Sequence, residues 1–156
     1  MKIKLVTIGK THQSFVDEGV TEFEKRIVKY IPYEKLELPA VKIPVGISVE
    51  EHKKKEAPVL LKAINEGDYL VLLDEKGRNY NSVEFSAQLQ KMLNRGPKSV
   101  CFMIGGAYGF DESLYKRANE KIALSSLTFS HQLVRLVFAE QLYRALTIIK
   151  GEKYHH

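Results

Sequence analysis

Two short runs of apolar residues, Tyr69–Leu73 and Val100–Ile104, place the strongest constraint on how this chain can fold. Neither run alternates between apolar and polar residues, as a strand with one face in water would. A strand that is apolar on both faces has to be covered on both faces, which is typical of parallel sheets. The sequence therefore predicts an α/β fold with a mainly parallel sheet sandwiched by helices.

Weaker patterns around these runs repeat the alternation of strand and helix. Further strands are predicted at Lys2–Ile8, Tyr33–Leu38 and Lys121–Leu124, and the polar character of Tyr33–Leu38 suits a position near an edge. Apolar spacing and end signals predict helices at about 12–31, 81–95, 111–119 and 130–150. No repeat or linker divides the 156 residues, so we expect a single domain over residues 1–156.

The segment Pro39–Glu56 is the least apolar part of the chain. Ser48 and Glu51 have the spacing of a helix capping box, and Pro58 predicts either a kink or the start of a new helix. The lysine run Lys53–Lys55 fits a solvated helix face best, and it also fits a surface that contacts RNA phosphates. The sequence leaves both interpretations open.

The last predicted helix is more apolar than a helix that covers one core. Ser130 can accept a hydrogen bond from an unpaired N–H of its first turn, and Gly151 is its expected end. Between them the apolar stripe is wider than the roughly 100° that one-sided packing requires. We therefore expect burial on two sides, either by the chain's own sheet or, as we favour, by the same helix of a second copy in a homodimer.

Composition sets broad limits on partners and location. The net charge of +5, from 24 basic and 19 acidic residues, is compatible with a polyanionic partner but does not require one. The single cysteine, Cys101, lies in an apolar run, so we expect a buried, reduced thiol and a cytoplasmic protein. The sequence shows no signal peptide and no apolar run near the ~20 residues of a membrane span. The five histidines lack metal-ligand spacing, so no metal site is expected.

Loops that follow parallel strands meet at one edge of a sheet, and here they come after Leu73, Ile104 and Leu124. The loop Gly105–Gly109 is neither GxGxxG nor a Walker loop, so no phosphate site is supported. It fits a plain tight turn, and it also fits a backbone surface that reads a flat ring such as adenine. S-adenosylmethionine suits the second interpretation because it carries no phosphate.

Several polar residues near these loops have two interpretations. Asp74 fits a turn before Gly77 better than a ligand contact. Glu140 and Arg144 have the spacing of a helical ion pair. Arg135 points about half a turn away from Arg144, so one of the two arginines should reach RNA or a partner subunit.

Three separated motifs, taken together, resemble one family. The run from Leu124 to His155 is similar to the C-terminal signature of SPOUT-class methyltransferases of the RlmH type, which methylate N3 of a pseudouridine in 23S ribosomal RNA. Leu72–Arg78 and Ile104–Gly109 occur in the order and approximate spacing of that family. The sequence departs from the family at Lys153, where a proline is common before the terminal Tyr-His.

The resemblance implies a SPOUT fold with a C-terminal trefoil knot, threaded by residues 105–149. It implies methyl transfer from S-adenosylmethionine to 23S rRNA in the assembled ribosome. The implied cofactor contacts are Leu73, Gly105, Leu124, Ser125, Ser126, Leu127, Thr128 and Phe129. The residues assigned to the substrate site are His131, Glu140, Arg144, Tyr154 and His155.

The identity of a catalytic base stays open at this point. His131, Glu140, Tyr154 and His155 are candidates, although His131 by itself fits a structural position at the helix start. A noncatalytic ribosome- or RNA-binding factor is the alternative function, since it would keep the basic surface and the dimer helix. A nucleotide-binding or hydrolytic enzyme is disfavoured because no phosphate loop or nucleophile motif occurs.

Overall fold

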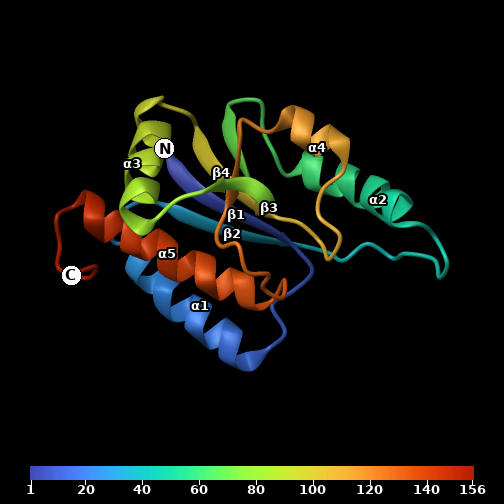
Figure 1. Ribbon diagram of the computed structural model, residues 1–156, viewed down its shortest axis with the longest axis horizontal. Coiled ribbons are helices and arrows are strands. Elements are labelled where there is room, and N and C mark those ends of the chain that lie inside the picture. The colour runs from blue at the N-terminus through green and yellow to red at the C-terminus, as the bar shows by residue number, and fades with distance from the viewer.

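The computed structural model describes residues 1–156 and contains one parallel sheet of five strands (Figure 1). The strands are β1 (Lys2–Ile8), β2 (Tyr33–Leu38), β3 (Asp68–Asn79), β4 (Ser99–Ile104) and β5 (Glu120–Ala123). Their order across the sheet is β2-β1-β4-β3-β5, and every neighbouring pair is parallel. The predicted parallel sheet is confirmed, and so is the position of β2 at an edge.

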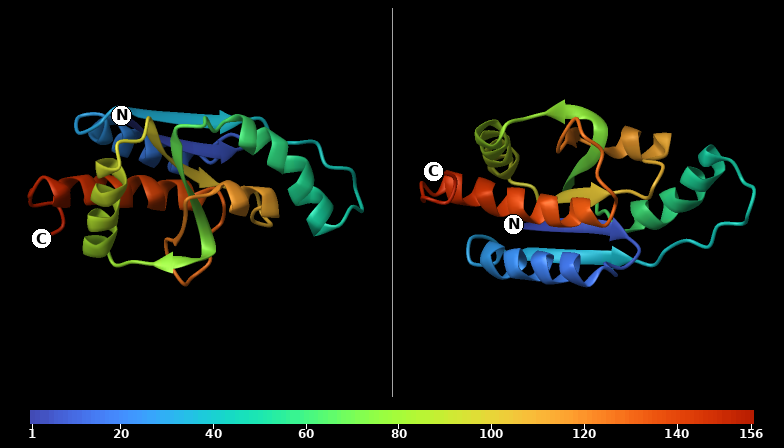
Figure 2. Two further views of the ribbon diagram at one scale, coloured as in Figure 1. Left: turned by 90° about the horizontal axis from the view of Figure 1, so that it is seen from above. Right: turned by 60° about the horizontal axis from the view of Figure 1, so that its bottom comes forward.

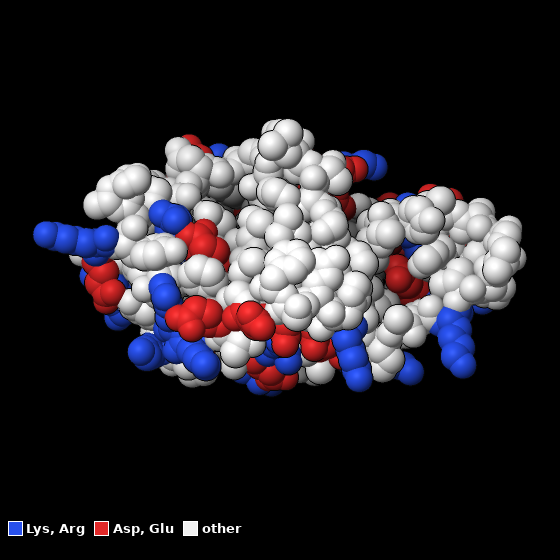
Figure 3. All heavy atoms as spheres, turned by 90° about the horizontal axis from the view of Figure 1, so that it is seen from below, with Lys and Arg blue, Asp and Glu red and all other residues white.

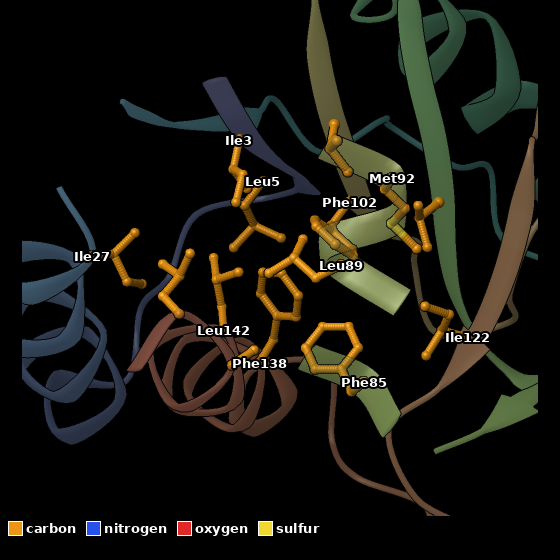
Figure 4. Packing of buried hydrophobic residues seen from close by; sticks show 14 of the residues in the cluster. Ile3, Leu5, Ile27, Phe85, Leu89, Met92, Phe102, Ile122, Phe138 and Leu142 are labelled. Carbon is orange, nitrogen blue, oxygen red and sulfur yellow. The ribbon is translucent and has the colours of Figure 1, made fainter. Parts of the chain in front are cut away.

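Helices cover both faces of this sheet (Figures 1 and 2). They are α1 (Ser14–Ile27), α2 (Val49–Lys62), α3 (Ser82–Asn94), α4 (Glu112–Arg117) and α5 (Leu133–Ile149). One hydrophobic core joins the strands to α1, α3 and α5, and a second joins them to α2 and α4. In the first core, Phe138 and Leu142 of α5 pack against Phe102 of β4 and Leu5 of β1 (Figure 4).

The capping signals in the sequence mark where the helices begin. Asn81 accepts a hydrogen bond from the backbone N–H of Glu84 at 2.8 Å, and the Glu84 carboxylate accepts one in return from the Asn81 N–H. Ser48 caps α2 with Oγ 3.1 Å from the Glu51 N–H, which is one half of the predicted capping box. Pro58 lies inside α2, which continues to Lys62, so a new helix does not start at this proline.

Strand β3 extends further than the apolar run that predicts it. It includes residues 74–79, where we expected Asp74 to start a turn, and that prediction was wrong. Between Leu73 and Arg78 the strand shifts its register and goes on pairing with β5. Gly77 permits this pairing, because a Cβ at its position would lie 2.6 Å from backbone atoms of Ile122.

Helix α5 packs against α1 and α3 on one face of the sheet. It begins at Leu133, three residues after the predicted start, although the Ser130 hydroxyl does accept a hydrogen bond from the Leu133 N–H at 3.1 Å. Gly151, at φ 72°, follows its last turn as expected. Leu133, Val137 and Ile148 remain half-exposed, so the chain's own sheet covers only part of the apolar stripe.

We expect Gly77→Ala to destabilise the protein by about 2 kcal/mol, because the added methyl group meets the backbone of β5, which cannot rotate away. Urea unfolding followed by circular dichroism measures this change in the free energy of unfolding. Lys76→Ala, one residue earlier and exposed, is the control and should change it by less than about 0.5 kcal/mol. Equal stability of the two variants would contradict the close approach of β3 and β5.

Candidate active site

A cavity of about 630 Å³ opens at the carboxyl ends of the central strands. Its volume is in the range of sites that hold a cofactor-sized molecule. Residues 73–76 of β3 and the loops after β4 and β5 form most of its wall, at the edge of the sheet where the strand order predicted a site. Residues of the predicted cofactor site that line it are Leu73, Gly105, Leu124, Ser125, Leu127, Thr128 and Phe129.

Ser126 is the one predicted cofactor contact outside the cavity wall. The loop turns at this point, since the Ser125 hydroxyl accepts a hydrogen bond from the Leu127 N–H at 2.9 Å. The turn leaves Ser126 exposed to solvent. A run of adjacent residues cannot all face one side of such a loop.

The glycine loop, residues 105–109, is packed closely on both sides. A Cβ on Gly105 would lie 2.9 Å from the Phe110 ring, and a Cβ on Gly106 would lie 2.6 Å from the carboxylate of Glu56 in α2. The loop closes on itself through a 3.2 Å hydrogen bond from the Gly109 N–H to the Gly106 carbonyl. The backbone at Gly105 and Gly106 is therefore presented to the cavity at a place where no side chain fits.

Helix α2 supports this loop from behind through Glu56. Its side chain is only 9% exposed and lies 3.5 Å from Nε2 of His52, one helical turn earlier. Burial raises the pKa of Glu56 above its ordinary value, and the nearby His52 opposes that rise. The His52 ring in turn meets the ring of Tyr108 edge to face, with 5.1 Å between centroids.

Asp74 and Tyr115 form a polar contact in the cavity wall that sequence reasoning missed. The Tyr115 hydroxyl donates a hydrogen bond to Oδ2 of Asp74, and the Lys76 N–H donates to Oδ1 at 2.8 Å. Burial, reinforced by the Asp74 carboxylate, raises the pKa of Tyr115. Asp74 could have been suspected from its place at a strand end, but no feature of the sequence points to Tyr115.

His131 lines the cavity from the segment that precedes α5. Burial lowers its pKa, and the positive charges of Arg135 and of His12 lower it further. The lowered pKa favours the neutral form of the imidazole. A neutral imidazole that faces a cavity can accept a proton from a bound molecule.

The other four residues assigned to the substrate site form a separate cluster at the far end of α5. Glu140 accepts hydrogen bonds from Arg144 Nε at 3.1 Å and from the Tyr154 hydroxyl at 3.0 Å, and Arg144 Nη1 lies 3.1 Å from Nδ1 of His155. The Glu140–Arg144 ion pair is thus confirmed. Arg144 is about 16 Å along the helix from Leu133, so within one chain this tail cluster lies far from His131.

Arg135 and Arg144 point in different directions from α5, as their spacing implies. Arg135 is the one that points into the protein interior. It is 2% exposed and donates hydrogen bonds to the carbonyls of Ile8 and Gly9, both at 3.0 Å, and to Glu37 at 3.2 Å. Arg144, half-buried in the tail cluster, is the arginine left near the surface.

Three further features bear on the chemistry of the chain. Cys101 is fully buried in β4, as predicted, and burial raises the pKa of its thiol to about 12. No group of three or more His, Cys, Asp or Glu side chains is arranged to hold a metal ion. None of the helices has the length and apolar character needed to cross a membrane.

Comparison with known proteins gives one consistent result along the whole chain. A family model described as "Predicted SPOUT methyltransferase" matches residues 1–155. The chain is 49% identical to the Ribosomal RNA large subunit methyltransferase H of Parabacteroides distasonis, over 100% of this chain and 99% of the relative. It is 50% identical to the protein of the same name from Cytophaga hutchinsonii, over the full length of both.

A solved structure of a probable methylase family protein from Haemophilus influenzae has a similar fold. It aligns with a TM-score of 0.52 over 99% of this chain and 70% of that protein, at 10% sequence identity. At such low identity the likeness concerns the fold alone. It agrees with the parallel sheet and its two helical layers.

We expect Arg135→Met to lower the free energy of unfolding by about 3 kcal/mol, because it takes the guanidinium away from two carbonyls at the end of β1 and leaves the Glu37 carboxylate with hydrogen bonds from Thr11 alone. Arg144→Met, on the same helix but in a half-exposed ion pair, should cost less than about 1 kcal/mol. Urea unfolding of both variants at pH 7 measures the difference. A larger loss for Arg144→Met would refute the assignment of Arg135 as the buried anchor.

Proposed function

The chain belongs to the SPOUT methyltransferase family, and on that basis we propose that it methylates N3 of a pseudouridine in 23S ribosomal RNA with S-adenosylmethionine as the methyl donor. It is a ribosomal RNA methyltransferase. The observation that supports the finer proposal is the meeting of the glycine loop and the segment 124–129 around one cavity. The chain is also about half identical to relatives named Ribosomal RNA large subunit methyltransferase H. Such a substrate, in the assembled ribosome, would be met in the cytoplasm.

The cavity suits S-adenosylmethionine in size and in chemistry. Gly105 and the backbone of residues 124–129 would hold the cofactor, with Leu73 covering its flat ring. The wall offers no phosphate-binding loop, and this cofactor has no phosphate to bind. When bound, the cofactor supplies an electrophilic methyl group.

The remaining work falls to the chain's own residues. They have to orient the target ring, exclude water and accept the proton that N3 loses. His131 suits the last role, since it lines the cavity and its lowered pKa favours the neutral imidazole. We assign it as the proton acceptor in preference to Glu140, Tyr154 and His155.

A homodimer would bring the tail cluster to a cavity. Within one chain the cluster of Glu140, Arg144, Tyr154 and His155 is separated from His131 by most of α5. On the face that carries α1 and α5, charged side chains border a central area without Lys, Arg, Asp or Glu (Figure 3). The half-exposed apolar residues of α5 and Phe15 of α1, which is 61% exposed, support pairing with a second copy. We propose that each tail acts at the partner's cavity.

The noncatalytic alternative finds less support. A factor that only binds ribosomes would have no need of a cavity lined by the glycine loop and the loop before α5. The trefoil knot threaded by residues 105–149 stays a prediction from the family resemblance.

The first test is calorimetric titration of S-adenosylmethionine into the wild-type protein and two variants. Gly105→Val should weaken binding by more than about tenfold, because its side chain collides with Phe110 and fills the approach to the backbone. Ser126→Ala, in the loop but outside the cavity wall, is the control and should bind like the wild type. Absence of binding to folded wild-type protein would favour the noncatalytic alternative.

The second test is complementation between subunits. Gly105→Val disables the cavity and His155→Ala disables the tail, so each homodimer should methylate ribosomes poorly. Co-expressed with different tags and purified as mixed dimers, the two variants should recover about half of the wild-type rate, because one of the two sites then has both parts intact. If the mixed dimers stay as inactive as their parents, the tail does not serve the partner's cavity.

A further inference from the structure

The rim of the cavity carries two side chains from outside the predicted cofactor site, and both suit contact with RNA. Lys53 lines the cavity from α2, and Tyr108 lines it from the glycine loop. Neither is among the individual cofactor contacts that the family resemblance implies, although Tyr108 shares the glycine loop with Gly105. Their chemistry, an ammonium group beside an aromatic ring, is that of surfaces which bind single-stranded nucleic acid.

Tyr108 is held in place and yet exposed. Its side chain is 53% exposed although it faces the cavity. The edge-to-face contact with His52 fixes the ring, and His52 is paired with the buried Glu56 that also packs against Gly106. A large aromatic residue that is restrained but open to solvent loses little entropy when a base stacks on it.

Lys53 differs from the lysine that follows it. Its side chain is only 19% exposed and lies 3.0 Å from Glu50, whose own side chain is 71% exposed. Lys54 is exposed and does not line the cavity. Lys53 thus lines the cavity while its ammonium pairs with Glu50 at the surface, and a phosphate at the cavity rim could replace this weak pairing.

We propose that Tyr108 stacks on a base next to the target nucleotide and that Lys53 binds a phosphate of the same RNA segment, with His52 and Glu56 as positioning residues behind Tyr108. This inference rests on the proposed function, since it assigns the RNA-binding part of the same site. It also decides between the two interpretations of Lys53–Lys55: Lys53 contacts RNA, and Lys54 belongs to the solvated face.

The experiment measures ribosome binding and methyl transfer for the wild type and two matched pairs of variants. The pairs are Tyr108→Ala with Tyr108→Phe, and Lys53→Gln with Lys54→Gln. Ribosomes from a strain that lacks this methyltransferase are the probe, and binding is followed by co-sedimentation over a range of salt concentrations. Calorimetry of S-adenosylmethionine is run on every variant.

Tyr108→Ala should weaken ribosome binding and raise KM by about tenfold, whereas Tyr108→Phe, which keeps the ring, should resemble the wild type. Lys53→Gln should weaken binding and reduce the slope of log affinity against log salt by about 0.7 to 0.9, the amount expected for one phosphate contact. Lys54→Gln should leave the slope unchanged. Cofactor affinity should stay within about twofold of the wild type throughout.

Two results would overturn the proposal. Unchanged ribosome binding in Tyr108→Ala and Lys53→Gln would remove both residues from the RNA surface. A loss of cofactor affinity in either variant would assign that residue to S-adenosylmethionine instead. Failure of the proposed function would give a different result, because the wild-type protein itself would then bind ribosomes without methylating them. The binding data would still show whether Tyr108 and Lys53 contact RNA.

Discussion

A charged side chain is stable in a protein interior only where its donors find acceptors, and Arg135 meets that condition at the start of α5. Its guanidinium reaches the carbonyls at the end of β1, the hydroxyl of Thr11 and the carboxylate of Glu37. Burial alone would raise the pKa of Glu37, but the hydrogen bonds from Thr11 and the charges of Lys35 and Arg135 bring it below its ordinary value. The first strand is thereby joined to the last helix, and the segment that presents His131 to the cavity depends on this junction.

Much of the sheet could be predicted because its central strands are apolar on both faces. The far end of β3 could not, since residues 74–79 are polar and take up a strand conformation only through pairing with β5. Which arginine of α5 is buried could not be predicted either, because it also depends on tertiary contacts. Helical spacing separates Arg135 from Arg144 in direction, but which of them is buried depends on partners in β2 and the loop after β1. These contacts are tertiary, and no local pattern encodes them.

The residues that line the cavity also fall into a group that the sequence predicts and a group that it does not. Loops after parallel strands meet at one edge of a sheet, so the contributions of Leu73, Gly105 and residues 124–129 followed from strand order and from the family resemblance. Lys53 and Tyr115 come from α2 and α4, and their presence depends on how these helices lie over the second face. Ser126, from the same predicted run, lies outside the cavity wall because a turn in its loop directs it to solvent. The sequence predicts which strand ends line the cavity better than it predicts which helices lie around them.

The burial of Cys101 makes the protein its own reporter of unfolding. Its sulfur lies at the centre of the sheet, in a strand paired on both sides, and its raised pKa leaves almost no thiolate at neutral pH. A thiol reagent can therefore modify the native chain only after β4 separates from the neighbouring strands and from α2 or α4. Since the chain has one cysteine, the mass of a pulse-labelled sample counts the molecules whose sheet has opened. When the reagent is concentrated enough to modify the thiol faster than the sheet recloses, the rate of labelling gives the lifetime of the closed sheet without any introduced probe.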